Sequence, residues 1–369
     1  MANFKKVAII GTGLMGGSLS MALKAHPGVG HVAVYDISPD ARLKARELEI
    51  SDEVTGSPGE AVRGCDLLFL ATPISAMVKV VHEVSGDLPA GAIISDLGSA
   101  KLETAAALGD ATPPGMHYVG GHPMTGSEQS GVEFASADLF RNCYYILTPT
   151  VDTDSEAFRR LHGLITDMGA RVISMDPETH DKAMATVSHT PHMLSLLLMD
   201  MAGKQYKEMK SLFTVAAGGF RDMTRIAASS PDVWVDICME NRKFIVQRLL
   251  EYGFGITELI DMLENRDRVK LEELFRRARR ARAELSVKAG REIDELFEVS
   301  LPVTDRPGVI SEVSTAVGSL GINIEDVEIV HPLEGETGIL TLRILGREQA
   351  GEARDRLEFL GYKAAVREG

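Results

Sequence analysis

The spacing of hydrophobic and polar positions changes along the chain and divides it into three stretches. In residues 1–175, short apolar runs alternate with helical segments, a pattern typical of buried parallel strands joined by helices. In residues 176–293 the strand-like runs stop, and apolar residues recur at helical spacing. Residues 294–369 alternate again, in the order strand, helix, strand, strand, helix, strand. A chain of 369 residues is too long for one ordinary core, so we expect three domains with these boundaries.

The same pattern places the individual elements. In the first stretch we expect strands at residues 5–10, 31–36, 66–71, 92–96, 118–119, 144–147 and 171–174, and helices at 18–25 and 155–168. In the second we expect a helix from residue 176, which Pro191 should kink or restart because it lacks an amide hydrogen, and helices at 234–252, 256–264 and 269–286. In the third we expect strands at 295–303, 321–325, 338–344 and 362–366, and helices at 309–319 and 348–360. The predicted fold is a Rossmann-type α/β domain, an all-helical domain and a ferredoxin-like βαββαβ domain.

A glycine-rich turn after the first strand predicts a dinucleotide site. Residues 11–16 read GTGLMG, a G-x-G-x-x-G between strand and helix, and Asp36 closes the next strand. Gly11 permits the tight turn, Gly13 lets the backbone approach a pyrophosphate, and Gly16 allows close helix–strand packing. A carboxylate at Asp36 would bind both ribose hydroxyls and repel a 2′-phosphate, so NAD is favoured over NADP. The alternative is a glycine-rich turn without a ligand. The expected cofactor-binding residues are Gly11, Thr12, Gly13, Leu14, Met15, Gly16, Asp36, Thr72 and Pro73.

Other polar residues follow strands of the predicted sheet. Ser99 and Lys101 come after the strand that ends at Asp96, at the carboxyl edge where ligands bind in open α/β sheets. Ser99 is equally well explained as a helix N-cap or as a site residue. Residues 120–128 read GGHPMTGSE, and we expect His122 on a loop at the end of a short strand. Such a histidine either is solvated in a turn or transfers protons.

Two motifs stand out in the helical stretch. Residues 188–192 read SHTPH; His189 and His192 have the spacing of metal ligands, but no further ligand stands out, so we expect no metal. A buried or capping histidine and a substrate contact remain equally open for this pair. Residues 218–225 read GGFRDMTR. Arg221 and Arg225 are either solvated or offer a guanidinium to an anionic substrate.

Composition limits the possible partners. The net charge of −14 argues against nucleic acid. Three cysteines far apart form neither a disulfide framework nor a zinc site. We see no charged-then-apolar leader and no apolar run of the ~18 residues that a membrane span needs, so we expect a cytoplasmic protein.

Taken together, the motifs resemble those of the prephenate/arogenate dehydrogenase family of tyrosine biosynthesis. They occur in this order: GTGLMG with Asp36, DLGSAK at 96–101, GGHPMTGS at 120–127, SHTPH at 188–192 and GGFRDMTR at 218–225. The resemblance covers residues 1 to about 290. The last stretch, with DRPG at 305–308 and GINI at 321–324, is similar to an ACT domain, a module that commonly binds amino acids between paired copies.

The resemblance implies an NAD-dependent oxidative decarboxylation of prephenate and a role for each motif. His122 would take the proton of the ring hydroxyl, and Ser99 would orient that hydroxyl. Arg225 would bind a substrate carboxylate, and Ser127, Ser188 and His192 would shape the pocket. L-tyrosine would be the effector, and the chain would form a homodimer. The effector-binding residues implied by the resemblance are Asp305, Pro307, Gly308, Asn323 and Ile324.

Three alternatives stay open at this stage. Arogenate could replace prephenate, because no residue in the sequence decides between a keto and an amino group on the side chain. Another dehydrogenase of the same layout, such as a β-hydroxyacid dehydrogenase or a pyrroline carboxylate reductase, would lack the His-Pro motif joined to the downstream motifs. A non-catalytic sensor of NAD and an amino acid would leave His122 without a role.

Overall fold

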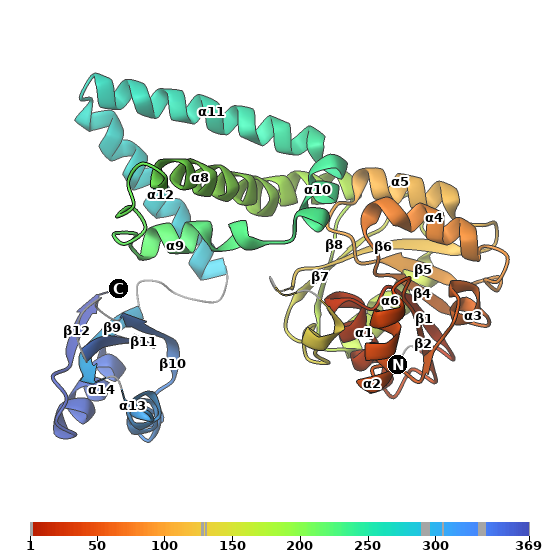
Figure 1. Ribbon diagram of the computed structural model, residues 1–369, viewed down its shortest axis with the longest axis horizontal. Helices are drawn as coiled ribbons and strands as arrows, with labels where there is room; N and C mark the ends of the chain where they lie inside the picture. The colour runs from red at the N-terminus through yellow and green to blue at the C-terminus, as the bar shows by residue number, and fades with distance from the viewer. Residues whose placement is uncertain are drawn as a thin grey trace. The chain divides into compact units, whose positions relative to one another are not determined.

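The computed structural model describes residues 3–126, 129, 131–288, 296–304, 306–330 and 337–368 (Figure 1). The chain forms two compact units, Met1–Gly255 and Ile256–Gly369. The first holds a large mixed sheet and most of the helical segments, and the second holds a small antiparallel sheet.

The large sheet has eight strands among the described residues, in the order β3-β2-β1-β4-β5-β6-β7-β8. Strands β1 to β6 pair in parallel, β7 pairs antiparallel with β6, and β8 pairs in parallel with β7. Their bounds are β1 Val7–Ile10, β2 Val32–Tyr35, β3 Glu53–Val54, β4 Leu67–Leu70, β5 Ile93–Asp96, β6 His117–Pro123, β7 Tyr144–Thr148 and β8 Arg171–Ser174. The chain order reverses direction between β1 and β4, which makes their carboxyl ends the expected ligand crevice.

Helices cover both faces of this sheet. They are α1 Leu14–Lys24, α2 Pro39–Glu47, α3 Pro58–Val62, α4 Ile74–Val84, α5 Leu102–Ala111, the short 3-10 helix η1 Val132–Phe134 and α6 Ser155–Asp167. Val7 and Ile9 share one core with α1 and α6, whereas Ala8 and Ile10 share another with α3 and α4. Burial on both faces explains why the strands are continuous apolar runs, and the predicted Rossmann-type domain is confirmed.

Two glycines let α1 approach the sheet closely. Gly11 has φ +101°, and a Cβ there would lie 2.4 Å from the carbonyl oxygen of Ala71. A Cβ on Gly16 would lie 1.9 Å from the carbonyl oxygen of Gly11. These positions therefore require glycine for the turn and for the helix–strand contact, as the motif predicted.

The helical segments are α7 Pro177–Met184, the π-helix η2 Ala185–His189, α8 Thr190–Tyr206, α9 Gly218–Thr224, the 3-10 helix η3 Arg225–Ala228, α10 Pro231–Glu240, α11 Arg242–Glu264 and α12 Arg268–Lys288. The restart predicted at Pro191 is confirmed, because α8 begins at Thr190 with Pro191 in its first turn. It follows a π-helical turn that joins it to α7. The Thr190 amide donates to the Ala185 carbonyl, five residues back, so the turn accommodates the missing Pro191 amide.

Two other helix boundaries differ from the prediction. The helix expected at 234–252 is divided at Asn241, which has the non-helical angles φ −102° and ψ 21°. The break expected after residue 252 is wrong, because α11 continues through Gly253 and Gly255. Each glycine costs a helix about 1 kcal/mol relative to alanine, which is too little to stop a helix with many apolar neighbours.

The small sheet confirms the predicted ferredoxin-like domain. Its elements are β9 Leu296–Thr304, α13 Val309–Gly318, β10 Ile324–Val330, β11 Thr337–Leu345, α14 Arg347–Phe359 and β12 Ala365–Glu368. The strands pair antiparallel in the order β10-β11-β9-β12. Val299 and Leu342 on the sheet pack with Val313 and Val317 of α13 and Leu357 of α14, so this domain has its own core.

The tight contact at Gly16 leads to a stability prediction. Gly16→Ala should lower the free energy of unfolding by about 1–3 kcal/mol, because the new methyl group must push α1 away from the Gly11 carbonyl. Gly109→Ala is the matched control, since Gly109 is also helical and a Cβ there meets nothing within 4 Å. Chemical denaturation should show a loss at Gly16 and none at Gly109. Equal midpoints for the two variants would contradict this account of α1 packing.

Candidate functional site

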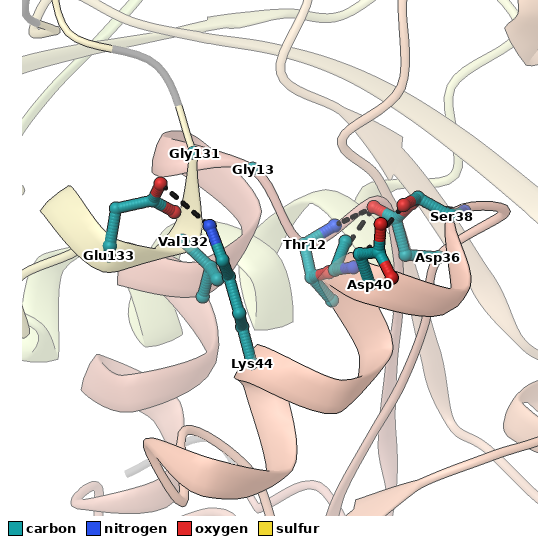
Figure 2. A pocket seen from close by; sticks show the side chains of 10 residues that line it. Thr12, Gly13, Asp36, Ser38, Asp40, Lys44, Gly131, Val132 and Glu133 are labelled. Carbon is teal, nitrogen blue, oxygen red and sulfur yellow. Dashed lines mark hydrogen bonds and ion pairs between the residues drawn. The ribbon is translucent and has the colours of Figure 1, made fainter.

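A cavity of about 220 Å³ opens beside the glycine-rich turn (Figure 2). Its lining residues are Thr12, Gly13, Asp36, Ser38, Asp40, Ala41, Lys44, Gly131, Val132 and Glu133. Gly13 caps the N-terminus of α1 without a side-chain hydrogen bond, and a Cβ there would meet nothing within 4 Å. The amide groups and positive end of a helix therefore face open space, which suits a pyrophosphate.

The carboxylate of Asp36 is fixed at the end of β2. Its Oδ2 accepts from the Thr12 amide at 2.7 Å, and its Oδ1 accepts from the Ser38 amide at 2.9 Å. The Thr12 hydroxyl also donates to Oδ2, at 3.2 Å. Two oxygens offer about four acceptor positions, so about one remains for a ribose hydroxyl. Figure 2 shows Asp36 held between Thr12 and Ser38 at this end of the cavity.

Neighbouring cations are already engaged. The Lys44 ammonium lies 2.9 Å from the Glu133 carboxylate (Figure 2). The Arg42 guanidinium donates to the carbonyls of Asp36 and Ile37 and lies over the Tyr35 ring. The Asp36 carboxylate would repel a 2′-phosphate, and neither Lys44 nor Arg42 is free to offset that repulsion. The residues therefore fit NAD better than NADP.

A second cavity, of about 230 Å³, lies at the carboxyl ends of β1, β4 and β5. Its lining residues are Met15, Ala71, Thr72, Pro73, Ile74, Leu97, Gly98, Ser99, Val233, Asp236 and Ile237. The last three belong to α10, which is tied to α4 by the Ser75 hydroxyl donating to Asp236 at 2.7 Å. Apolar walls with a few polar groups are typical of a small-molecule site, and this cavity lies where a nicotinamide would be expected.

A buried ion pair supports the loop that carries Ser99. The Lys101 ammonium contacts the Asp96 carboxylate and donates to the Gly121 carbonyl at 2.8 Å. Asp96 also accepts from the Tyr118 hydroxyl and the Gly98 amide, each at 2.7 Å. Lys101 and Asp96 are both fully buried, and such a pair is stable only when hydrogen bonds satisfy it. The pair thus fixes the end of β5 against β6.

His122 lies within β6 rather than on a loop. It faces Ile146 of β7 in an antiparallel pair, and only 7% of its surface is exposed. The loop expected at this position and the solvated turn are both wrong, because β7 extends the sheet over residues 120–123. The imidazole Nδ1 lies 2.8 Å from Nε2 of His180. His180 Nδ1 in turn lies 2.7 Å from Oδ1 of Asp181.

Burial lowers the basicity of these imidazoles. Desolvation, and then the charges of His180, Lys101 and His189, hold the pKa of His122 well below its usual 6.5. Desolvation also lowers the pKa of His180, against the raising effect of Asp181. It lowers the pKa of His189 to about 4. The imidazoles are therefore neutral at pH 7, the form in which a nitrogen can accept a proton.

A third histidine and an aromatic ring build the next part of the site. The His192 ring stacks on Trp234 with centroids 3.5 Å apart, and desolvation lowers its pKa. His189 meets the edge of the same indole. The side-chain Nδ2 of Asn241 donates to the main-chain carbonyl of Asp181 at 2.9 Å and contacts His189 Nδ1 at 3.0 Å. Both histidines of the SHTPH motif therefore have protein partners: His192 contacts Trp234, and His189 contacts Trp234 and Asn241.

The remaining expected residues have different positions. Thr72, Pro73, Met15 and Ser99 gather at the second cavity, whereas Leu14 is the first residue of α1. Ser99 is not the cap of α5, since Lys101 occupies that position and the Asp181 carboxylate accepts from the Lys101 and Leu102 amides.

The other residues from the resemblance lie on several segments. Ser188 is half-buried in the π-helical turn, and Arg225 is exposed where η3 begins. Pro307 and Gly308 line a cavity in the small domain. Asn323 donates to Glu325, and Ile324 begins β10. Ser127 and Asp305 lie outside the described residues. The roles of these residues stay predictions.

Sequence reasoning missed His180, Asp181, Trp234 and Asn241 as members of the site. Trp234 is the single tryptophan of the chain, which was the one signal that could have drawn attention to it. The other three are recognised only through contacts between segments far apart in sequence.

Two features are absent from the described part of the chain. No helix there is long and apolar enough to cross a membrane. No group of three or more histidine, cysteine, aspartate or glutamate side chains there could hold a metal ion.

Three family models match the chain in succession. The model described as "Prephenate dehydrogenase, nucleotide-binding domain" matches residues 19–174, "Prephenate dehydrogenase, dimerization domain" matches 176–277, and "ACT domain" matches 298–361.

Curated relatives and solved structures agree with these models. A prephenate dehydrogenase of Bacillus subtilis is 32% identical, over 95% of this chain and 94% of that protein. A cyclohexadienyl dehydrogenase of Zymomonas mobilis is 35% identical, over 77% and 97%. The structure of prephenate dehydrogenase from A. aeolicus, in complex with hydroxyphenyl propionate and NAD+, has a TM-score of 0.71 at 31% identity and covers 76% of this chain and 98% of that one. The chain therefore belongs to the prephenate dehydrogenase family of NAD-dependent oxidoreductases and carries an ACT domain.

Proposed function

We propose that this chain catalyses the NAD-dependent oxidative decarboxylation of prephenate to 4-hydroxyphenylpyruvate. The observation that carries the proposal is a buried, neutral imidazole, His122, on the strand beside the loop of Ser99 and the second cavity. A neutral histidine in a dry site is suited to accept one proton as a hydride leaves the same substrate. NAD, when bound, supplies the hydride acceptor.

Each group has a defined task in this scheme. His122 takes the proton of the ring hydroxyl while the C4–H bond gives up its hydride, and the ring carboxylate departs as carbon dioxide. The C4 oxygen becomes a carbonyl and, as carbon dioxide leaves, a phenolate. The phenolate takes the proton back from His122 to give the phenol of the product. Ser99 orients the hydroxyl. Its half-buried position in the second cavity supports this role.

The substrate carboxylates and ring need further contacts. We assign a carboxylate to Arg225, because a guanidinium binds a carboxylate with two parallel hydrogen bonds. We propose that Ser188 and His192 form walls of the pocket, together with Ser127, which lies outside the described residues. The stack of His192 on Trp234 supports a flat aromatic wall there.

Exposed apolar side chains support a homodimer. On α8, α10 and α11 of the first unit, Leu197 is 62% exposed, Leu250 70% and Phe254 67%, and Val235 and Met239 are exposed as well. Large apolar patches mark interaction surfaces, and the matching family model carries the word dimerization in its description. We also propose that the protein is cytoplasmic, which its three unpaired cysteines support.

The small domain is proposed to bind L-tyrosine as an effector, within a division of the chain into domains 1–175, 176–293 and 294–369. A cavity of about 730 Å³ supports this. Its lining residues are Val303, Arg306, Pro307, Gly308, Val309, Ile310, Ser311, Ser314 and Ile329. Arg306 lines this cavity and pairs with Glu312. We propose that it exchanges this exposed partner for the effector carboxylate. Asp305, Asn323 and Ile324 complete the proposed set.

The reaction is tested by following NADH formation with prephenate and, in parallel, arogenate. Prephenate should give the higher kcat/KM. His122→Asn should lower kcat by about 10²–10⁴-fold, as for loss of a general base, while prephenate still binds. His82→Asn is the control, because His82 is exposed on α4. Near-normal turnover of His122→Asn would exclude His122 as the base, and a higher kcat/KM with arogenate would reassign the substrate.

The pH dependence follows from the lowered pKa of His122. A histidine whose pKa is depressed stays neutral until the pH falls below that lowered value, so the base is available throughout the neutral range. The acid limb of kcat/KM should therefore lie well below pH 6.5, with no loss between pH 8 and 6.5. An acid limb centred at or above pH 6.5 in the wild type would contradict the assignment.

The effector proposal is tested with the full chain. L-tyrosine should inhibit turnover and release heat in calorimetry. Arg306→Ala should weaken tyrosine binding about 10- to 100-fold, because a hydrogen bond to a charged group is lost. Arg347→Ala, at the exposed start of α14, is the matched control and should bind tyrosine normally. Equal tyrosine affinity in both variants would move the effector site away from Arg306.

A further inference from the structure

We propose that His180 and Asp181 act as a positioning relay behind His122, which fixes the tautomer of His122 and shares the positive charge it acquires. The inference rests on the proposed role of His122 as the base. It concerns two residues that the sequence motifs did not mark, and it follows from the hydrogen bonds that join the three side chains.

The chain of contacts determines where each proton lies. Oδ1 of Asp181 accepts from the Lys101 amide and Oδ2 from the Leu102 amide, each at 2.8 Å. Both oxygens therefore act as acceptors, and a carboxylate can only accept. His180 must then carry its hydrogen on Nδ1, which lies 2.7 Å from Oδ1. A neutral His180 has no hydrogen left for Nε2.

The tautomer of His122 follows from that of His180. Because Nε2 of His180 lacks a hydrogen, Nδ1 of His122 must donate across the 2.8 Å contact. The lone pair of neutral His122 is then on Nε2, the nitrogen that does not face the relay. The relay thus selects the one tautomer that leaves an acceptor for the substrate hydroxyl.

Burial makes this selection strict. His180 is fully buried and Asp181 is 1% exposed. Water is therefore not at hand to supply a second partner for either imidazole nitrogen. The nearby Lys101 ammonium is neutralised by Asp96, which leaves Asp181 as the anion in contact with the histidine pair. A buried polar network of this kind is stable only when every member is satisfied.

The same contacts can move charge. When the substrate hydroxyl gives its proton to Nε2 of His122, the imidazole becomes a cation with Nδ1–H still pointing at His180. Transfer of that hydrogen to Nε2 of His180 breaks one N–H bond and forms another. The cation then lies against the Asp181 carboxylate at 2.7 Å. Reversal of this transfer returns the hydrogen to Nδ1 of His122. Nε2 of His122 then gives its proton to the phenolate oxygen of the product, which leaves both imidazoles neutral again.

The capping of α5 does not depend on His180. Asp181 accepts the Lys101 and Leu102 amides directly, so a change at His180 leaves the start of that helix capped. Substitution of Asp181 would uncap the helix as well as break the relay. His180 is therefore the residue at which a positioning role separates from a structural one.

The test compares two variants of His180 in the full chain. His180→Leu removes both hydrogen bonds and should lower kcat by about 10²–10³-fold, since the wrong tautomer blocks general-base catalysis. His180→Gln offers an amide oxygen to Nδ1 of His122, keeps the tautomer but carries no proton onward, and should lower kcat only about 10-fold. The KM values for prephenate and NAD should stay within about two-fold in both variants. His82→Leu and His82→Gln, at an exposed position, are the controls.

A spectroscopic signature reports the tautomer without turnover. With 15N-labelled histidine, His122 should show a protonated Nδ1 and an unprotonated Nε2 in the wild type and in His180→Gln. The hydrogen should move to Nε2 in His180→Leu. A protonated Nε2 on His122 in the wild type would overturn the relay.

The kinetic outcomes distinguish the relay from the proposed function. Wild-type kcat in His180→Leu, together with an inactive His122→Asn, would overturn the relay and leave His122 as the base. An active His122→Asn would remove the base and the relay together. If both His180 variants lowered the melting temperature and raised KM well beyond two-fold along with the loss of kcat, His180 would have a structural role. That result would overturn the proposal.

Discussion

The carboxylate of Asp181 is the contact on which the arrangement of the site depends. Helix α5 begins with amide groups that have no partner in their own helix, and Asp181 of α7 accepts two of them. The main-chain carbonyl of Asp181 accepts a hydrogen bond from the side-chain Nδ2 of Asn241, at the junction of α10 and α11. One residue therefore joins the sheet domain to two helical segments. Without it, buried amides would lose their partners, at a cost of about 1–3 kcal/mol each.

A second buried charge pair sets the electrostatic environment of the site. Lys101 follows the loop of Ser99, and its ammonium reaches back to Asp96 and to the carbonyl of Gly121, the residue before His122. The ammonium thus holds β5 against β6 and also opposes protonation of His122. Burial is the main reason that the pKa of His122 is low, followed by His180, and the Lys101 ammonium adds to the effect. The cation that fixes the strand therefore also contributes to the low basicity of the neighbouring imidazole.

Features that depend on neighbouring residues in the sequence were predictable, whereas features that depend on distant segments were not. The glycine spacing at 11–16 encodes a turn and a helix contact within a few residues, and both have the expected geometry. His122 was recognised by its motif, but its strand and its burial depend on β7, more than 20 residues later. The question of whether Ser99 caps α5 was answered by Asp181, which lies 79 residues from Leu102. Contacts at such separations leave no periodic signal in a single sequence.

The π-helical turn between α7 and α8 sets the angular register of the site. His192 lies twelve positions after His180, and twelve steps of about 100° would place them about 120° apart around an ideal α-helix. A π turn absorbs roughly one residue, and eleven such steps come within about 20° of three full turns. Both imidazoles then project from nearly the same side of one continuous helix, His180 toward His122 and His192 onto Trp234. The π-helical turn therefore rotates the residues that follow it, so that His180 and His192 lie on nearly the same side of the helix.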